Sequence, residues 1–132
     1  MLQLYPSCSL WGEQFSPKSA AEESGILLED ASEVGELGTR WRYRGLPQPY
    51  GMAFIRAPAE IPAAERLSWI AAAVSRHLPT FRKHGAEQVV LNLSVGYKHQ
   101  CNLEFSPQEL RSIADLGIPF TITCVWDDDL PD

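Results

Sequence analysis

The sequence predicts an α+β fold with two layers, in which a mostly antiparallel sheet of five or six strands carries about three helices and the long helix packs on one face. Two patterns support this prediction. Apolar residues recur at helical spacing over residues 62–78, and they alternate with polar residues over residues 89–97. The chain has 132 residues, about the length of one domain, so we interpret residues 1–132 as a single α+β domain.

The first elements in chain order are a strand and a short helix. Residues 2–11 are rich in apolar side chains, but Pro6 has no N–H to donate and predicts that this strand is interrupted and lies at a sheet edge or a bulge. Ser16 followed by Pro17 is a typical helix start, and Gly25 is a typical helix end. We therefore expect a short helix between them.

The middle of the chain predicts a loop, two strands and the long helix. Residues 26–38 form an acidic stretch whose length as a loop suggests a function, and residues 39–43 and 52–56 have the aromatic and β-branched residues of strands. The helix over residues 62–78 is expected to end or kink at Pro79, because a proline inside a helix removes a hydrogen bond. Its buried face is predicted to consist of Leu67, Ile70, Ala71, Val74, Leu78 and Phe81.

The last third of the chain begins with the alternating segment, which predicts a half-buried antiparallel strand. Further strands are expected at residues 102–105 and 120–126. Between them, Ser106 and Glu109 have the spacing of a capping box and predict the start of a third helix. The acidic tail, residues 127–132, is expected to be frayed.

Composition and charge limit the classes of partner. Apolar residues make up 45% of the chain, and no apolar run approaches the roughly 20 residues that span a bilayer, so we expect no membrane partner. The N-terminus lacks the pattern of a secretory signal, and a cytoplasmic location is expected. A net charge of −6 argues against direct nucleic-acid binding and favours a basic protein partner.

The cysteines and histidines predict no reactive centre. Cys8, Cys101 and Cys124 are widely spaced and are interpreted as apolar core residues with free thiols, with a reactive or metal-binding thiol near His99 as the alternative. His99 and Cys101 could pair as base and nucleophile, but residues two apart on a strand need not touch. Because no catalytic motif is present, we predict no catalytic residues, no metal, no cofactor and no enzymatic activity.

Three arginines are the main candidates for binding an anion. Arg40, Arg42 and Arg44 alternate with aromatic residues, so on a strand they would line one face. Such a row could bind carboxylate or phosphate groups. The alternative is internal: the acidic loop just upstream folds over the arginines and neutralises them.

Four carboxylates and a tryptophan are the candidates for binding a protein. Glu29, Asp30, Glu33 and Glu36 are expected to form an exposed surface that contributes little to folding. Trp69 falls outside the main apolar face of the long helix and is a candidate exposed anchor.

The order of turn and cap signals gives a family resemblance. It is carried by residues 95–110 and 116–124, with residues 11–17 and 38–44 in support, and it covers nearly the whole chain. In these segments the chain resembles a family of small bacterial proteins of unknown function. Members of such families often look like immunity proteins of polymorphic-toxin systems, which bind and block a toxin domain. The resemblance implies binding and transfers no catalytic residue.

The leading hypothesis from the sequence is therefore an immunity protein that neutralises a cognate toxin by direct binding. The partner would be a basic toxin domain, and the contact surface would be acidic and centred on residues 29–36. The alternative is a small anionic-ligand-binding or enzymatic α+β domain that uses the three arginines. A third hypothesis is a structural or homodimeric module.

Overall fold

A single mixed sheet with strand order β2-β3-β1-β4-β5 forms the centre of the protein. The computed structural model describes residues 2–39 and 41–132. Its strands are β1 (Leu2–Gly12), β2 (Glu29–Ser32), β3 (Gly51–Ile55), β4 (Gln88–Tyr97) and β5 (Phe120–Trp126). β4 and β5 are parallel, and the other neighbours are antiparallel. The predicted α+β fold with a mostly antiparallel sheet is confirmed.

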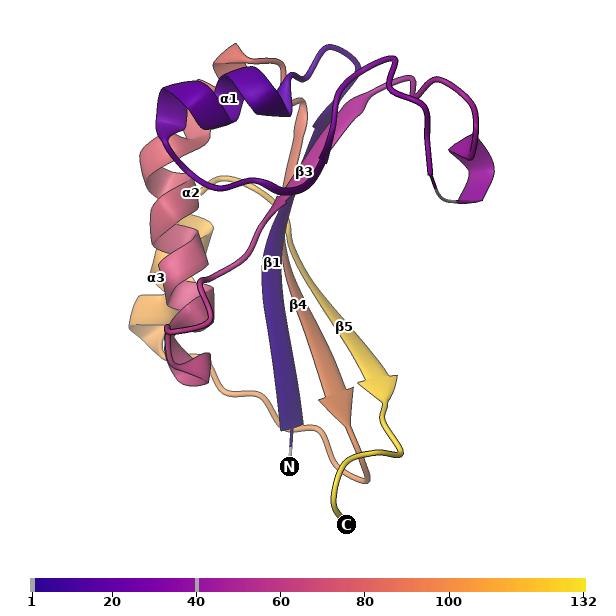
Figure 1. Ribbon diagram of the computed structural model, residues 1–132. Helices are drawn as coiled ribbons and strands as arrows, with labels where there is room; N and C mark the ends of the chain where they lie inside the picture. Colours follow the sequence, from indigo (N-terminus) through magenta and orange to yellow (C-terminus); the bar gives the residue numbers. More distant parts are fainter. Residues whose placement is uncertain (1, 40) are drawn as a thin grey trace.

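The helices lie together on one face of this sheet (Figure 1). They are α1 (Pro17–Ser24), α2 (Arg66–Lys83) and α3 (Pro107–Ala114), with short 3-10 helices η1 (Trp41–Tyr43) and η2 (Ala63–Glu65). The core fills the space between the sheet and α2, and its fully buried members include Cys8, Leu10, Ile55, Leu91, Ile70, Val74 and Phe81. No helix in the described part of the chain has the length and apolar character needed to cross a membrane.

Both short helices begin where the capping residues predict. The Ser16 hydroxyl accepts a hydrogen bond from the Ser19 N–H, and Gly25 ends α1 with a positive φ of 74°. At α3, the Ser106 hydroxyl accepts from the Glu109 N–H while the Glu109 carboxylate accepts from the Ser106 N–H. The capping box is therefore complete.

The long helix runs through Pro79 to Lys83, so of the two predicted outcomes, an end or a kink at this proline, the end was wrong. Proline cannot donate the hydrogen bond that the carbonyl of Ser75 would accept in a regular helix. Both residues are exposed, so water can take the place of the missing donor. The helix instead ends near Gly85, whose N–H donates to the carbonyl of Arg82.

The N-terminal strand β1 lies at the centre of the sheet and is not interrupted at Pro6, contrary to the prediction. Its pairing with β4 runs from Leu2 to Trp11, whereas its pairing with β3 begins only at Cys8. Pro6 therefore has a neighbouring strand on one side alone. A proline is tolerated there as it is on an edge strand.

Two predicted strands are absent from the structure. Of residues 39–43, the segment Trp41–Tyr43 is the 3-10 helix η1, and residues 102–105 form an irregular connection. Strand propensity reflects packing against neighbouring strands, and neither segment lies beside one. Near η1 the chain turns sharply instead, because Gly45 takes a φ of 76° and the Leu46 N–H donates to the carbonyl of Tyr43.

The acidic tail folds back onto the sheet, whereas the sequence predicted a frayed end. Leu130 is buried, and the Lys98 Nζ lies 2.8 Å from the Asp132 carboxylate. The same ammonium donates to the carbonyl of Leu130. Lys98 follows β4 directly, so it offers the tail a fixed cation.

Candidate functional site

Residues 33–48, hereafter the arm, leave the sheet after β2 and return just before β3. They project from one end of the sheet to the side opposite the helices (Figure 1). Backbone hydrogen bonds of 2.8 Å join Gly35 to Gln48, Gln48 to Glu36, and Gly38 to Leu46, so the arm is built like a hairpin with η1 at its turn. No described residue of the arm belongs to the hydrophobic core.

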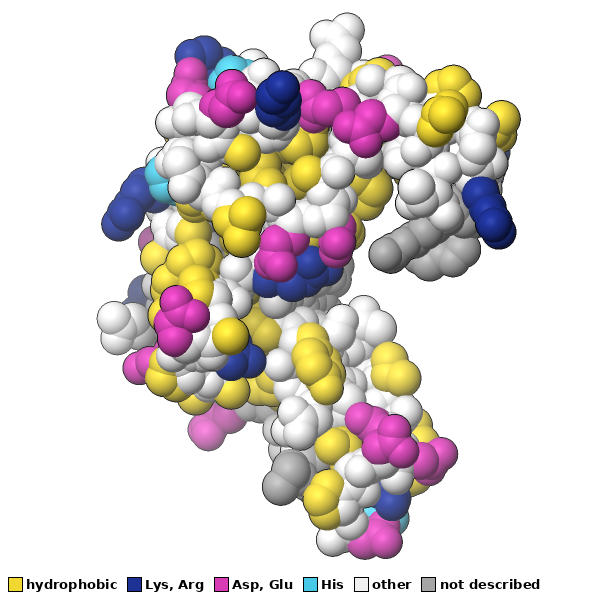
Figure 2. All heavy atoms as spheres, in the orientation of Figure 1, with side chains coloured by type: hydrophobic (Ala, Val, Ile, Leu, Met, Phe, Trp, Pro, Cys, Tyr) yellow, Lys and Arg dark blue, Asp and Glu magenta, His cyan; other side chains and the backbone are white. Residues whose placement is uncertain are grey.

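The arm carries apolar side chains that the rest of the protein leaves exposed. Leu37 is 65% exposed, Leu46 is 54% exposed and Val34 is 45% exposed. Figure 2 shows hydrophobic side chains gathered at the outer part of the arm. Apolar residues scattered singly are normal on a surface, but a group of them on one projection is typical of an interaction site.

An aromatic row connects the arm to the sheet. The ring centroids of Tyr43 and Tyr50 are 5.9 Å apart, and those of Tyr50 and Trp11 are 5.3 Å apart. Trp11 alternates with the buried residues Leu10 and Gly12 of β1, so its side chain lies on the sheet face opposite the helices. The contact between the two tyrosines is edge-on and that between Tyr50 and Trp11 is tilted, and together they connect the arm to that face.

This second face of the sheet, hereafter the open face, is uncovered by the elements that the structure describes (Figure 1). Alternation places polar side chains on it. The Asn92 amide donates to the Ser9 hydroxyl at 3.2 Å and accepts from the Thr121 hydroxyl at 2.7 Å, which links β1, β4 and β5. Figure 2 shows that the molecule is hollowed between the arm and the far end of the sheet.

The four predicted carboxylates do not form one unpaired surface. Residues 29–32 are the edge strand β2, although a loop was predicted. Asp30 forms an ion pair of 2.9 Å with Arg56, and Glu33 accepts hydrogen bonds from the Ser16 hydroxyl and the Lys18 N–H. Two of the four are thus engaged within the molecule. Half-buried Glu29 and exposed Glu36 remain as candidates for contact with a partner.

The predicted row of three arginines on one strand face was wrong, because η1 replaces the strand. Arg42 and Arg44 are exposed on the arm, and the Arg42 guanidinium lies 5.7 Å from the centroid of the Tyr43 ring. Arg40 lies outside the described residues. The ion pairs seen in the described part of the chain involve neither Arg42 nor Arg44, so its acidic residues do not neutralise them.

A different set of arginines lines a groove of about 920 Å³ beside α2. Arg56 follows β3, and Arg66 and Arg76 lie on α2. Arg66 is partly engaged, because it donates to the carbonyls of Ile61 and Ala59. Sequence reasoning missed this set because the three residues belong to different elements and share no spacing.

Trp69 also lines this groove. Its side chain is half-buried and packs against the core on one side. Glu29 is also among the residues that line the groove. The predicted anchor therefore lies in a hollow and does not project from the surface.

Two of the three cysteines lie outside the core, so the prediction that all three are core residues was wrong. Cys8 is buried, but Cys101 is half-buried and Cys124 is exposed. The sulfur atoms of Cys101 and Cys124 are 3.8 Å apart. His99 does not complete a nucleophile–base pair with Cys101, because its ring contacts Asp132 at 3.2 Å and packs edge-on to Trp126.

In the described residues, no three histidine, cysteine, aspartate or glutamate side chains are grouped as metal ligands would be. The chain matches no protein-family model, and comparisons with curated proteins and with solved structures give no significant match.

Proposed function

We propose that this protein works by binding another protein through the arm and the open face of the sheet. The observation that carries the proposal is the arm itself, which exposes Leu37 and Leu46 and contributes no residue to the core. A chain segment that neither fills the core nor pairs with the sheet gains little for folding. It does offer apolar contact area to a partner, and a group of exposed apolar side chains is typical of an interaction site.

The partner proposed is a basic toxin domain, as the resemblance to immunity proteins implies. The net charge of −6 supports this choice, because complementary charge raises association rates and disfavours wrong partners. Glu29 and Glu36 are the two predicted carboxylates left after Asp30, which is ion-paired with Arg56, and Glu33, which accepts hydrogen bonds from Ser16 and Lys18. The role proposed for this protein is that of an inhibitor that covers the toxin surface without catalysis.

Co-expression with a toxin domain encoded beside its gene tests the proposal. The parent protein should protect the host cells, and Leu37→Asp with Leu46→Asp should abolish protection, because two charges would be buried at the contact. Leu110→Asp is the matched control, since Leu110 is 50% exposed but lies on α3. Failure of the parent to protect would contradict the immunity function, and equal protection by all variants would contradict the arm as the contact surface.

The role of the remaining carboxylates is tested separately by association kinetics with the same toxin domain. Glu29→Lys with Glu36→Lys should slow association by about tenfold or more at low salt, and added salt should shrink the difference. The control with equal charge change is Glu22→Lys with Glu104→Lys, two exposed positions outside the arm. If both double variants slow association equally, the effect is one of net charge and not of this surface.

A second candidate function is binding of a small anionic ligand in the groove beside α2. Three arginines and Trp69 line it, with Glu29 as a carboxylate among the lining residues. Guanidinium groups bind phosphate and carboxylate with paired hydrogen bonds. Titration with inorganic phosphate and with citrate, followed by NMR, should shift the Trp69 indole signal in the parent and not in Arg56→Gln with Arg76→Gln. Equal shifts in both proteins would exclude the groove as the site.

A further inference from the structure

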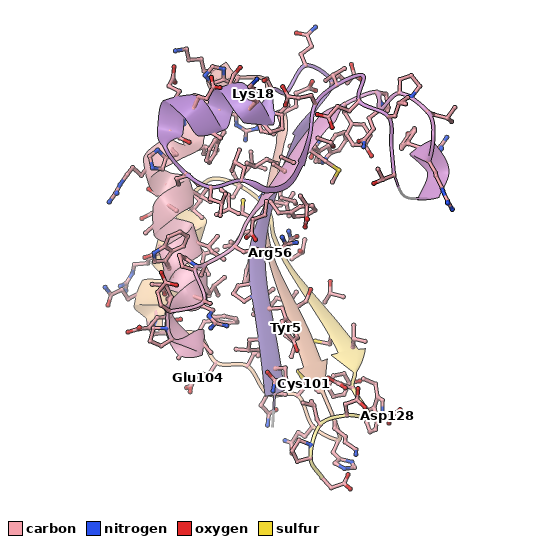
Figure 3. The ribbon with its side chains drawn as sticks, in the orientation of Figure 1. Tyr5, Lys18, Arg56, Cys101, Glu104 and Asp128 are labelled. Carbon is pink, nitrogen blue, oxygen red and sulfur yellow. The ribbon has the colours of Figure 1, made fainter. Side chains whose placement is uncertain are left out.

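The Cys101 and Cys124 thiols lie side by side although the sequence separates them by 23 positions. Cys124 is in β5 opposite Val95 of β4, so alternation directs it to the same side of the sheet as the helices. The connection from β4 to α3 must cross that side, because α3 lies on it. Cys101 sits in this connection, and Figure 3 shows it beside the end of the sheet.

Both sulfurs can be reached from solvent, in contrast to the third. Cys124 is exposed and Cys101 is half-buried, whereas Cys8 is buried in the core. Burial raises the pKa of the Cys8 thiol to about 12, so Cys8 stays protonated and inert. The chain thus contains one inert thiol and one accessible pair.

We propose that Cys101 and Cys124 form a reversible disulfide when the protein meets a low-molecular-weight disulfide. The sulfurs are 3.8 Å apart, and a disulfide needs about 2.05 Å, so they must approach by about 1.8 Å. Cys101 lies in an irregular connection that no strand pairing holds, and side-chain rotation with a small shift of this connection supplies the approach. The proposal is independent of partner binding by the arm.

The reaction is a thiol–disulfide exchange in which the external disulfide is the oxidant. The Cys124 thiolate attacks one sulfur of that disulfide and releases one thiolate, which leaves a mixed disulfide on Cys124. The Cys101 thiolate then attacks the Cys124 sulfur and releases the second thiolate. The two protein thiols lose two electrons and two protons, and the external disulfide becomes two thiols.

The order of the two steps follows from the surroundings of the thiols. Partial burial, and then the hydrogen bond and charge of the neighbouring Cys124 sulfur, raise the pKa of Cys101. Cys101 therefore stays protonated to a higher pH than an ordinary cysteine and suits the second, intramolecular attack. Cys124 is the more exposed sulfur and suits the first attack on an external molecule.

The bond would attach the connection between β4 and α3 to the edge strand β5. β5 pairs only with β4, so one of its two edges is free. A crosslink that closes a loop across this edge restricts the unfolded chain and raises Tm by roughly 5–10 °C. Oxidation thus ties the edge strand β5 to a second segment besides β4.

The test uses the full chain, fully reduced and then incubated with oxidised glutathione, followed by alkylation and mass spectrometry of the intact protein and its peptides. The parent should lose two hydrogens and two alkylatable thiols, and a Cys101–Cys124 peptide should be found. Cys101→Ser and Cys124→Ser should give no crosslink and should each carry one glutathione on the remaining surface thiol. Excess reductant should restore the parent and lower its Tm to the starting value.

Two outcomes would overturn the proposal. One is a parent protein that carries glutathione on both Cys101 and Cys124 without the crosslink, which would show that the sulfurs cannot close. The other is a crosslink that joins two molecules and not one. Cys8→Ala is the control, and it should form the crosslink as the parent does because Cys8 is buried apart from the pair. If this variant does not fold, the peptide map of the parent still identifies the bonded pair.

Discussion

Glu33 accepts a hydrogen bond of 2.6 Å from the Ser16 hydroxyl, and this contact ties the base of the arm to the N-terminus of α1. The same carboxylate accepts from the Lys18 N–H. A carboxylate is stabilised at this end of a helix because the first N–H groups have no partner within the helix. Glu33 was predicted as a partner-binding residue, but its contacts give it a role in folding.

The first prediction follows from this contact. Glu33→Lys should lower the free energy of unfolding by about 1–2 kcal/mol, because it removes the acceptor and places a cation at a helix N-terminus. Glu36→Lys makes the same charge change on the exposed part of the arm and should alter stability by less than about 0.5 kcal/mol. Urea denaturation measures both, and equal losses would show that Glu33 is not a capping residue.

The second prediction concerns the core beneath α2. Ile70 is completely buried, so Ile70→Ala should lower the free energy of unfolding by about 2–5 kcal/mol through lost burial and a cavity. Leu110→Ala, on the exposed side of α3, should cost less than about 1 kcal/mol. Chemical denaturation distinguishes the two, and similar losses would contradict the packing of α2 on the sheet.

The third prediction concerns Gly85, which joins α2 to β4. Its φ is 99°, and a Cβ at this position would overlap the backbone of Gln14 and Phe15. Gly85→Ala should therefore destabilise the protein by more than about 2 kcal/mol. Gly35 in the arm also has a positive φ, but a Cβ there meets nothing, so Gly35→Ala should cost only about 1 kcal/mol. Thermal unfolding measures the Tm of both variants. An equal fall in Tm would refute the close approach of Gly85 to the backbone of Gln14 and Phe15.

The fourth prediction is a pH dependence of the tail. Hydrogen bonds from Lys98, and then from His99, hold the pKa of the Asp132 carboxyl below its ordinary value. A lowered pKa means that the contact is fully present above about pH 4 and is lost only as the pH falls through the lowered value. The amide of Leu130 should stay protected from hydrogen exchange until that acid range is reached.

Asp132→Asn removes this titrating group. Protection of Leu130 should then be weaker than in the parent and should stay the same at every pH between about 3 and 6. A transition in the parent that is centred above the ordinary aspartate pKa would be inconsistent with the Lys98 contact.

The elements that the sequence predicted correctly have local signals. Ser16 and Ser106 fix the starts of α1 and α3 within one turn, and the spacing of apolar residues fixes the buried face of α2. The alternation of β4 is equally local, and Val89, Leu91, Leu93 and Val95 are buried as it requires. Such signals need no knowledge of distant neighbours.

The candidate sites depend on neighbours and could not be predicted in the same way. Arginine and aromatic residues alternate around η1 just as they would in a strand. The segment forms a 3-10 helix because no strand of the sheet lies beside it. The closeness of Cys101 and Cys124 follows from the path between β4, α3 and β5. The role of Glu33 depends on α1, which precedes it by a loop and a strand.

The position of β1 has a consequence for synthesis on the ribosome. Of the described strands, β1 comes earliest in the chain and lies at the centre of the sheet, and its pairing with β4 joins Leu2 to Tyr97. At a synthesis rate of about 5–20 residues per second, β1 waits roughly 5–20 s for that partner to emerge. During this interval only β3 can pair with β1, over residues 8–12, so the first half of β1 has no neighbouring strand. Loss of residues 88–132 would remove β4 and leave β1 paired with β3 alone.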